Sequence, residues 1–548
     1  MNNTLFNTKY SSLLLGIMAF CSSCDGFLDN VPITSQLESN YFENEVRVEK
    51  GIGSIYSEVG VLYAPNFGGG GAFNGTPLFA LWQLPGDDLT VDNNNNSDFE
   101  GFFPLSVDNK KIQNYWSILY AIINRANFML DQLSRPELLS KITEDYANCC
   151  KGEALFLRSW SNMLLWDGFR KAPNQSSRIT DIESSVLPPS KSFELLDQAI
   201  NDLILSEQLL PESWNMKNKG RVFKNSARGL LVKCYILRAC YSSLYGGDRL
   251  NDYKNAINAF ESISEESSIE GVHFGENFDY RTENNKESLF EYQASENPQQ
   301  EDNPWLNGNQ GGQSGALGTV YIQFWESYYT FGSFFGPTNK LIKAFESGDP
   351  RMDETVSNTS QTNKYDWMKG GWKYFDGYQF IKYINGERRG RLDKKYGKTS
   401  PNNPRILRLG DVKLAIAEAY LQTGDEASAR RQLNDIRKRA RLSTSDGSIS
   451  TVPADYNRPI TMEDIMNERL IELAGEGMRY SDMKRWHVAG YINLGEWAAN
   501  PKLMWGYDTE NKADFQFDVT KHLLWPIPYS EMARNPLLLS DGNNPGYN

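Results

Sequence analysis

The sequence predicts a mostly α-helical protein in which tetratricopeptide-like helical hairpins form a scaffold. An irregular, loop-rich lobe with few short strands is expected to offer the ligand-binding surface. Apolar residues recur at steps of three and four over several stretches, as one buried helix face requires. Residues 60–110 and 292–340 lack this period and are rich in Gly, Asn, Pro and aromatic residues. Segments this long are usually functional or disordered, and their aromatic content favours a functional role.

The chain begins with the pattern of a lipoprotein export signal. Lys9 is followed by a short apolar run at 13–20, by two serines and by Cys24. This run is far shorter than the about 20 residues that cross a bilayer core of roughly 30 Å. We therefore expect residues 1–23 to be removed and the Cys24 thiol to be lipidated. An ordinary signal peptide with incidental cysteines is the alternative.

Two helical stripes mark the first half of the chain. The first consists of Ala154, Leu157, Ser161 and Leu164. The second, after two prolines at 188–189, consists of Phe193, Leu196, Ala199, Ile200 and Leu203. Each stripe follows the spacing of one buried helix face, so both stretches are predicted to be helices.

The clearest pattern is a pair of stripes near the C-terminus: Leu409, Val412, Ile416 and Tyr420, then Ala429, Leu433, Ile436 and Ala440. Gly424 between them can end one helix, and Asp425 can cap the next. Two such helices with small interfacial alanines look like a tetratricopeptide hairpin. A further helix is expected to open with a capping box at Thr461 and to run to Trp486.

Composition narrows the ligand class. The 548 residues carry a net charge of −13, which argues against nucleic acid and anionic lipid as partners. Neutral, hydroxyl-rich ligands remain natural candidates. The six cysteines do not form a disulfide or metal pattern, so buried free thiols are expected. With three histidines far apart in sequence, we expect no metal site, no cofactor and no His-dependent triad.

Several sequence blocks together resemble the SusD/RagB family of surface-exposed outer-membrane lipoproteins from glycan-degrading Gram-negative bacteria. In chain order these blocks are Cys24 with 27–29 and Pro32, then 115–127, 152–158, 220–231, 345–351, 408–440, 468–486, 526–536 and 544–547. Each block alone is weak, but nine in the right order are specific. We interpret most of them as scaffold. Glu468, Glu472, Arg479 and Arg485 stand at helical spacing and look like an internal ion-pair network.

The resemblance implies the domain organisation and the function. Residues 24–270 would be an N-terminal SusD-like helical region and 271–548 a C-terminal RagB/SusD region, joined in one compact body. The protein would capture oligo- or polysaccharide without catalysis and deliver it to a SusC-like TonB-dependent β-barrel. The lipid on Cys24 would hold it at the cell surface of the outer membrane. A lipid-anchored glycoside hydrolase, a peptide-binding family member and a purely structural helical-repeat protein are the alternatives.

Candidate catalytic carboxylates are few. Glycoside hydrolysis needs two carboxyl groups about 5–10 Å apart across a sugar. Asp87 and Asp88 are adjacent, so on an extended strand they would point to opposite sides. The oxygen-rich run 92–98 lacks the Gly and the closing Glu of an EF-hand loop. We therefore expect no enzyme activity and treat this run as a polar surface loop.

Aromatic residues are the better indicator of the binding site. The apolar C–H faces of pyranose rings stack on exposed Trp and Tyr side chains, while amides and carboxylates pair with the hydroxyls. Trp82 and Trp325 are the leading candidates because a packed helix face gives no reason for either. The full set of predicted ligand-binding residues is Trp82, Asp87, Asn94, Phe102, Trp305, Trp325, Tyr328 and Tyr329.

Overall fold

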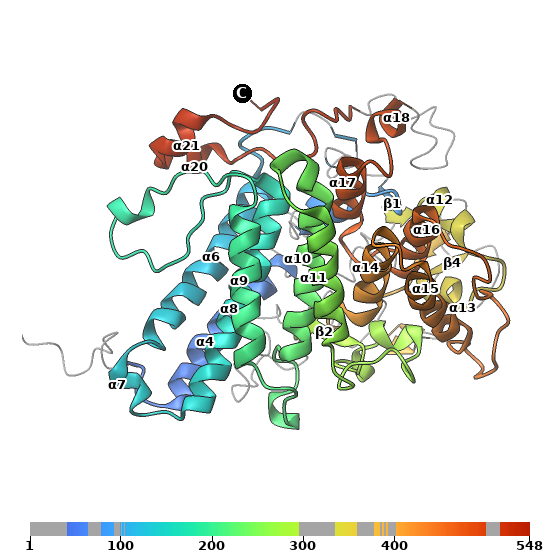
Figure 1. The fold of residues 1–548 in the computed structure, drawn as a ribbon, viewed down its shortest axis with the longest axis horizontal. Helices are drawn as coiled ribbons and strands as arrows, with labels where there is room; N and C mark the ends of the chain where they lie inside the picture. The colour runs from blue at the N-terminus through green and yellow to red at the C-terminus, as the bar shows by residue number, and fades with distance from the viewer. Residues whose placement is uncertain are drawn as a thin grey trace, which may run out of the picture.

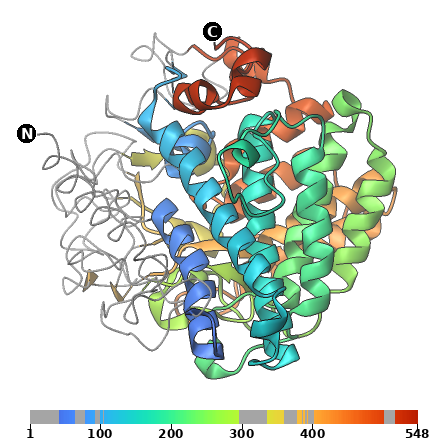
Figure 2. The ribbon, with the colours of Figure 1, turned by 90° about the vertical axis from the view of Figure 1, so that its left-hand side faces the viewer.

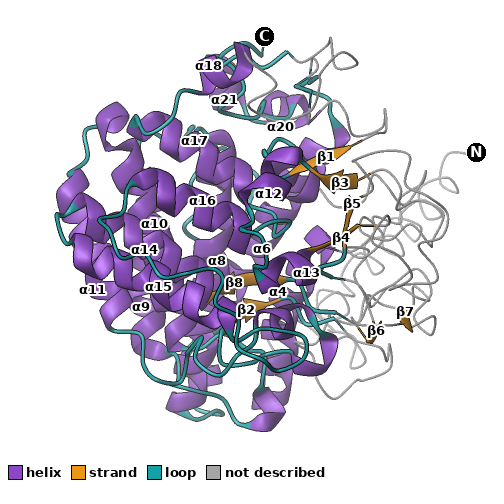
Figure 3. Ribbon diagram, turned by 90° about the vertical axis from the view of Figure 1, so that its right-hand side faces the viewer, coloured by secondary structure: helices purple, strands orange, loops and turns teal. Residues whose placement is uncertain are grey.

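The computed structural model describes residues 41–63, 78–91, 99, 101–102, 105–294, 335–358, 378–383, 386–387, 391–392, 402–499 and 516–547. These residues form a mostly helical protein with a few short strands, which confirms the predicted fold class (Figures 1 and 3). None of the helices in these ranges is both long and apolar enough to cross a bilayer.

Six long helices form the N-terminal half: α4 (Glu45–Tyr63), α6 (Lys110–Gln132), α8 (Glu144–Phe169), α9 (Glu194–Leu209), α10 (Lys224–Tyr245) and α11 (Arg249–Glu261). The chain packs α4 on α6, α6 on α8, α8 on α9 and α10 on α11. Figure 2 shows α4 and α6 lying side by side. Every residue of the two predicted stripes at 154–164 and 193–203 is buried, because these faces meet the neighbouring helices.

The predicted C-terminal hairpin is present. It consists of α14 (Leu409–Gln422) and α15 (Glu426–Arg441), which pack against each other. Gly424 has a φ of +89°, and the Asp425 carboxylate accepts a hydrogen bond from the Ser428 N–H at 3.0 Å. All eight residues of the two stripes are buried. The hairpin also contacts α10 and α11, so the two halves of the chain share one core.

The single helix expected from Thr461 to Trp486 is wrong. The chain instead forms α16 (Met462–Glu472) and α17 (Arg479–Ala489), with a turn between them. The predicted capping box between Thr461 and Asp464 does open α16. The helix then breaks because Gly475 and Gly477 adopt positive φ angles of +73° and +100°, which only glycine reaches without strain.

The strands form four antiparallel pairs (Figure 3). The pairs are β1 (Leu89–Val91) with β3 (Phe335–Pro337), β2 (Ser288–Glu291) with β8 (Arg405–Arg408), β4 (Val356–Asn358) with β5 (Tyr378–Phe380), and β6 (Gly386–Glu387) with β7 (Arg391–Leu392).

Short helices complete the described chain. They are η2 (Phe79–Gln83), α7 (Pro136–Leu139), η3 (Glu183–Ser185), η4 (Met216–Asn218), η5 (Phe274–Phe278), η6 (Tyr280–Thr282), α12 (Asn339–Ala344), α13 (Pro350–Thr355), α18 (Leu494–Ala499), α20 (Tyr529–Arg534) and α21 (Pro536–Asp541).

A buried ion-pair network runs through the C-terminal half. Glu472 contacts the guanidinium groups of Arg351, Arg408 and Arg439, and all four side chains are at most 4 % exposed. Burial alone would raise the pKa of Glu472, but the three cations hold it well below its usual range. The other three predicted network residues are ion-paired too: Glu468 with Arg351 and Arg437, Arg479 with Asp87, and Arg485 with Glu418 and Asp482. Each of the four is thus ion-paired as expected, but not with another of the four. Their partners, however, come mostly from elements distant in sequence.

Three of the four described cysteines are buried free thiols, as predicted. Cys150, Cys234 and Cys240 are buried free thiols, and Cys149 is half-buried. Burial raises the pKa of Cys240 to about 11 and that of Cys234 to about 12, so both stay protonated. Among the described residues there is no cluster of three His, Cys, Asp or Glu side chains that would hold a metal ion.

Candidate functional site

The β1–β3 ladder joins the ends of two aperiodic segments. Val91 pairs with Phe335, and Leu89 pairs with Pro337. The segment 92–98 therefore leaves β1 at the point where the segment 295–334 enters β3. Asn94 belongs to the first segment and Trp305, Trp325, Tyr328 and Tyr329 to the second. These five predicted ligand residues lie outside the described residues, and their assignment stays a prediction.

Described residues that border two further segments, 359–377 and 393–401, contact residues that border 295–334. β3 contacts β5, which follows the segment 359–377. The Ala294 N–H, just before 295–334, donates to the side-chain oxygen of Asn403, just after 393–401, at 2.7 Å. Figure 3 shows β1, β3, β4 and β5 gathered on one side of the helical body. We call the described ends Val91, Phe335 and Tyr378 the strand-end face.

Asp87 fixes β1 to two helices. Its carboxylate accepts from the Arg479 Nε at 2.6 Å and from the Lys340 Nζ at 2.6 Å. Burial by itself would raise the pKa of Asp87, but these two cations outweigh it and lower the pKa. The predicted role of Asp87 as a ligand-binding residue is therefore wrong, because the side chain is 2 % exposed and already paired.

Asp88 is held by neutral donors instead. The Gly475 N–H donates to its carboxylate at 2.9 Å, and the Gln83 amide donates to both carboxylate oxygens. Burial raises the pKa of Asp88, the reverse of the change at Asp87. The backbone carbonyl of Asp88 also accepts from the Thr338 N–H at 3.0 Å. Together the two aspartates tie the strand-end face to α12 and to the turn between α16 and α17.

Trp82 is not a sugar platform. It belongs to η2, is fully buried, and donates from its indole N–H to the Tyr115 hydroxyl at 2.8 Å. The Lys484 ammonium lies 4.5 Å from the ring centroid. The indole faces are thus covered by α6 and α17, which corrects the prediction. Leu81 and Leu84 are also buried. These apolar neighbours of Trp82 were the sequence signal that this stretch packs into the core.

Phe102 is also part of the core. Its side chain is 1 % exposed, and its ring centroid lies 5.5 Å from that of Tyr480 and 5.2 Å from that of His522. The predicted role of Phe102 in ligand binding is therefore wrong. Sequence reasoning placed Arg479 in an ion-pair network, but it missed that Arg479 and Lys340 contact Asp87 from elements more than 200 positions away.

Two sequence models of known families match this chain. The sequence model of the SusD family matches residues 278–547. A second model, described as "Starch-binding associating with outer membrane", matches residues 85–236. The chain belongs to the SusD/RagB family.

Individual relatives agree along nearly the whole chain. A SusD-like protein from Bacteroides ovatus is 24 % identical and covers 95 % of each chain. A solved structure named "Laminarin binding SusD-like protein" has a TM-score of 0.67 at 20 % identity, covering 92 % of this chain and 100 % of that one. A crystal structure with xylogluco-oligosaccharide has a TM-score of 0.65 at 19 % identity, covering 90 % of this chain and 97 % of its own.

Proposed function

We propose that this protein captures an oligo- or polysaccharide without cleaving it and delivers it to a SusC-like TonB-dependent β-barrel of the outer membrane. The observation that carries the proposal is the β1–β3 ladder. It pairs Val91, the residue before the polar segment 92–98, with Phe335, the residue after the aromatic-rich segment 295–334. Aromatic platforms beside amide and carboxylate groups suit the two chemical faces of a pyranose.

The relatives support a glycan as the ligand class. One structural neighbour is named for laminarin binding, and another was solved with a xylogluco-oligosaccharide. In this chain we assign the sugar platform to Trp305, Trp325, Tyr328 and Tyr329, with Asn94 pairing with hydroxyls. Trp82, Asp87 and Phe102 are excluded from this assignment because all three are buried.

A glycoside hydrolase is the competing function. The adjacent acids Asp87 and Asp88 are both buried and engaged by donors, so neither carboxylate is placed to protonate a leaving group or attack a sugar. This arrangement favours binding without cleavage. Release of reducing ends from a polysaccharide panel measures the difference. We expect none above the buffer control, and steady release by purified protein would support the hydrolase instead.

The membrane anchor and the transporter are parts of the same proposal. A model matching residues 85–236 is described by outer-membrane association, which agrees with a lipid on Cys24. Cys24→Ala should move the protein from the membrane fraction to the soluble fraction, with Cys21→Ala as the matched control. A variant that stays membrane-bound and protease-accessible would contradict the anchor.

Partner binding has its own test. Mild detergent extraction of cells that also express the neighbouring transporter gene, followed by affinity capture of this protein, should recover a TonB-dependent β-barrel. A stable lid on a barrel needs an interface of about 2,000 Å² or more, so the complex should survive washing. Recovery of this protein alone would count against delivery to a transporter.

A further inference from the structure

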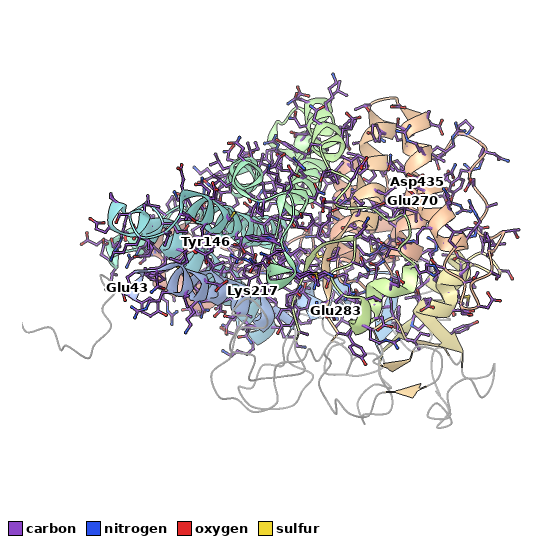
Figure 4. All side chains as sticks on the ribbon, turned by 90° about the horizontal axis from the view of Figure 1, so that it is seen from below. Glu43, Tyr146, Lys217, Glu270, Glu283 and Asp435 are labelled. Atoms are coloured by element: carbon purple, nitrogen blue, oxygen red, sulfur yellow. The ribbon has the colours of Figure 1, made fainter. Side chains whose placement is uncertain are left out.

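A cavity of about 720 Å³ opens among the last residues of α11, the following segment 262–273 and the α14–α15 hairpin. All of its lining residues belong to the described part of the chain, and none comes from the strand-end face. Figure 4 shows two of its residues, Glu270 and Asp435, close together on the underside of the molecule. The volume falls within the range of about 300–1,000 Å³ that is common for small-molecule sites.

The inner wall of the cavity is apolar. Ile269 and Val272 are 7 % and 6 % exposed, and Phe260 and Ile263 lie beside them. Leu442 on the opposite side is 39 % exposed, which is high for a leucine. This wall would bury the apolar C–H faces of a ligand.

Positively and negatively charged side chains both line the cavity. The Lys413 Nζ lies 2.8 Å from the Asp435 carboxylate, so these two charges cancel. The ammonium of Lys438 and the carboxylate of Glu270 have no side-chain partner among the described residues, and both are exposed. The cavity thus offers a free donor and a free acceptor without a net field that would attract an ion.

A neutral ligand with hydroxyl groups on its edges and C–H groups on its faces fits this combination. We propose that the cavity is a second carbohydrate-binding site, distinct from the strand-end face. Lys438 would donate to sugar hydroxyls, Glu270 and Asp435 would accept from them, and the Phe260–Val272 wall would contact a pyranose face. This inference rests on the proposed function, that the protein binds glycans.

A second site would change how the protein holds a polymer. A polysaccharide chain long enough to reach both sites would bind the second one intramolecularly, which raises avidity by roughly 10²–10⁴-fold without new contacts. A short oligosaccharide would occupy the two sites independently.

Calorimetric titration with laminari- and xylogluco-oligosaccharides tests the proposal. We expect two bound oligosaccharides per wild-type protein and one for Lys438→Ala combined with Asp435→Ala. Arg431→Ala is the matched control, because Arg431 is exposed on the same helix but does not line the cavity. It should retain two. Equal melting temperatures of all three proteins show that the fold is kept.

Hydrogen exchange provides a readout that needs no variant. Saturating oligosaccharide should slow amide exchange at 267–273 and 447–449, the two lining segments that lie outside the helices. One bound sugar per wild-type protein, with unchanged exchange at these segments, would overturn the second site and leave the proposed function intact. No binding of any glycan in the panel would overturn both.

Discussion

Arg479, the first residue of α17, donates its Nε–H to the Asp87 carboxylate across 2.6 Å and so locks the start of that helix to the turn before β1. Both side chains are at most 8 % exposed. The contact spans 392 positions of sequence. Because Asp87 lies two residues before β1, and β1 pairs with β3, this buried ion pair helps to fix the position of the strand-end face.

Breaking this pair should destabilise the protein. Asp87→Ala leaves the Arg479 guanidinium buried without its carboxylate, and loss of one partner of a buried pair costs about 3–5 kcal/mol. Urea unfolding followed by tryptophan fluorescence measures the change. Arg534→Ala is the control, because its ion pair with Glu531 is largely exposed and should contribute less than about 1 kcal/mol. Equal effects of the two substitutions would contradict the structural role of Asp87.

Removal of the charge of the neighbouring Asp88 should not destabilise the protein, in contrast to the loss of the Asp87 carboxylate. Its carboxylate is buried without a paired cation, which raises its pKa, so ionisation of Asp88 costs stability at neutral pH. Asp88→Asn keeps an oxygen for the Gly475 N–H, and the unpaired Gln83 Oε1 can accept from the new amide if the Gln83 side chain turns over. We expect a melting temperature equal to or above that of the wild type. A loss as large as that of Asp87→Ala would refute this reasoning.

The contribution of Asp87 to the free energy of unfolding should fall as the pH is lowered. Its pKa is lowered on folding, so the folded state binds this proton less tightly than the unfolded chain does. The ion pair therefore contributes fully above the unfolded pKa of about 3.9 and is lost as the pH falls below it. The difference in unfolding free energy between wild type and Asp87→Asn should be constant above about pH 5 and shrink below about pH 4. A difference that grows on acidification would be incompatible with this pairing.

Replacement of Gly477, in the turn between α16 and α17, tests whether this turn needs a residue with a positive φ angle. Gly477 has a φ of +100°, where a Cβ costs roughly 1–2 kcal/mol. Gly477→Ala should lower the melting temperature by about 1–2 °C, because the unfolding entropy is about 2.1 cal/mol/K per residue and this chain is long. As the control, Ala427→Ser at an exposed position in the first turn of α15 should change it little. An unchanged melting temperature for Gly477→Ala would mean that the turn adapts without strain.

Periodic segments were predictable because their burial is local. The stripes at 154–164, 193–203 and 409–440 report which helix face is apolar, and this face is buried whatever the neighbour. The break at Gly475 was missed although Gly475 and Gly477 together are a local signal for a helix end. The hydrogen bond from the Gly475 N–H to the distant Asp88 has no such local signal.

The location of the ligand site stays a prediction, and three of the residues assigned to it from the sequence, Trp82, Asp87 and Phe102, are buried. The aperiodic composition identified the segments that meet at the β1–β3 ladder. It did not separate exposed aromatics from those in short packed turns, so Trp82 and Phe102 were misassigned. The separation depends on contacts with Tyr115 and Tyr480, which no local pattern encodes.

Calorimetric titration of glycans into Trp305→Ala combined with Trp325→Ala tests the central claim, sugar capture by aromatic residues at the strand-end face. Removal of an aromatic platform typically costs at least about 2 kcal/mol, and each 1.4 kcal/mol is about tenfold in affinity. We expect the tight glycan site to weaken at least about tenfold while the melting temperature stays unchanged. Tyr529→Ala, an aromatic that is 55 % exposed on α20, should bind as the wild type does. A folded double variant with wild-type affinity at every site would contradict the claim.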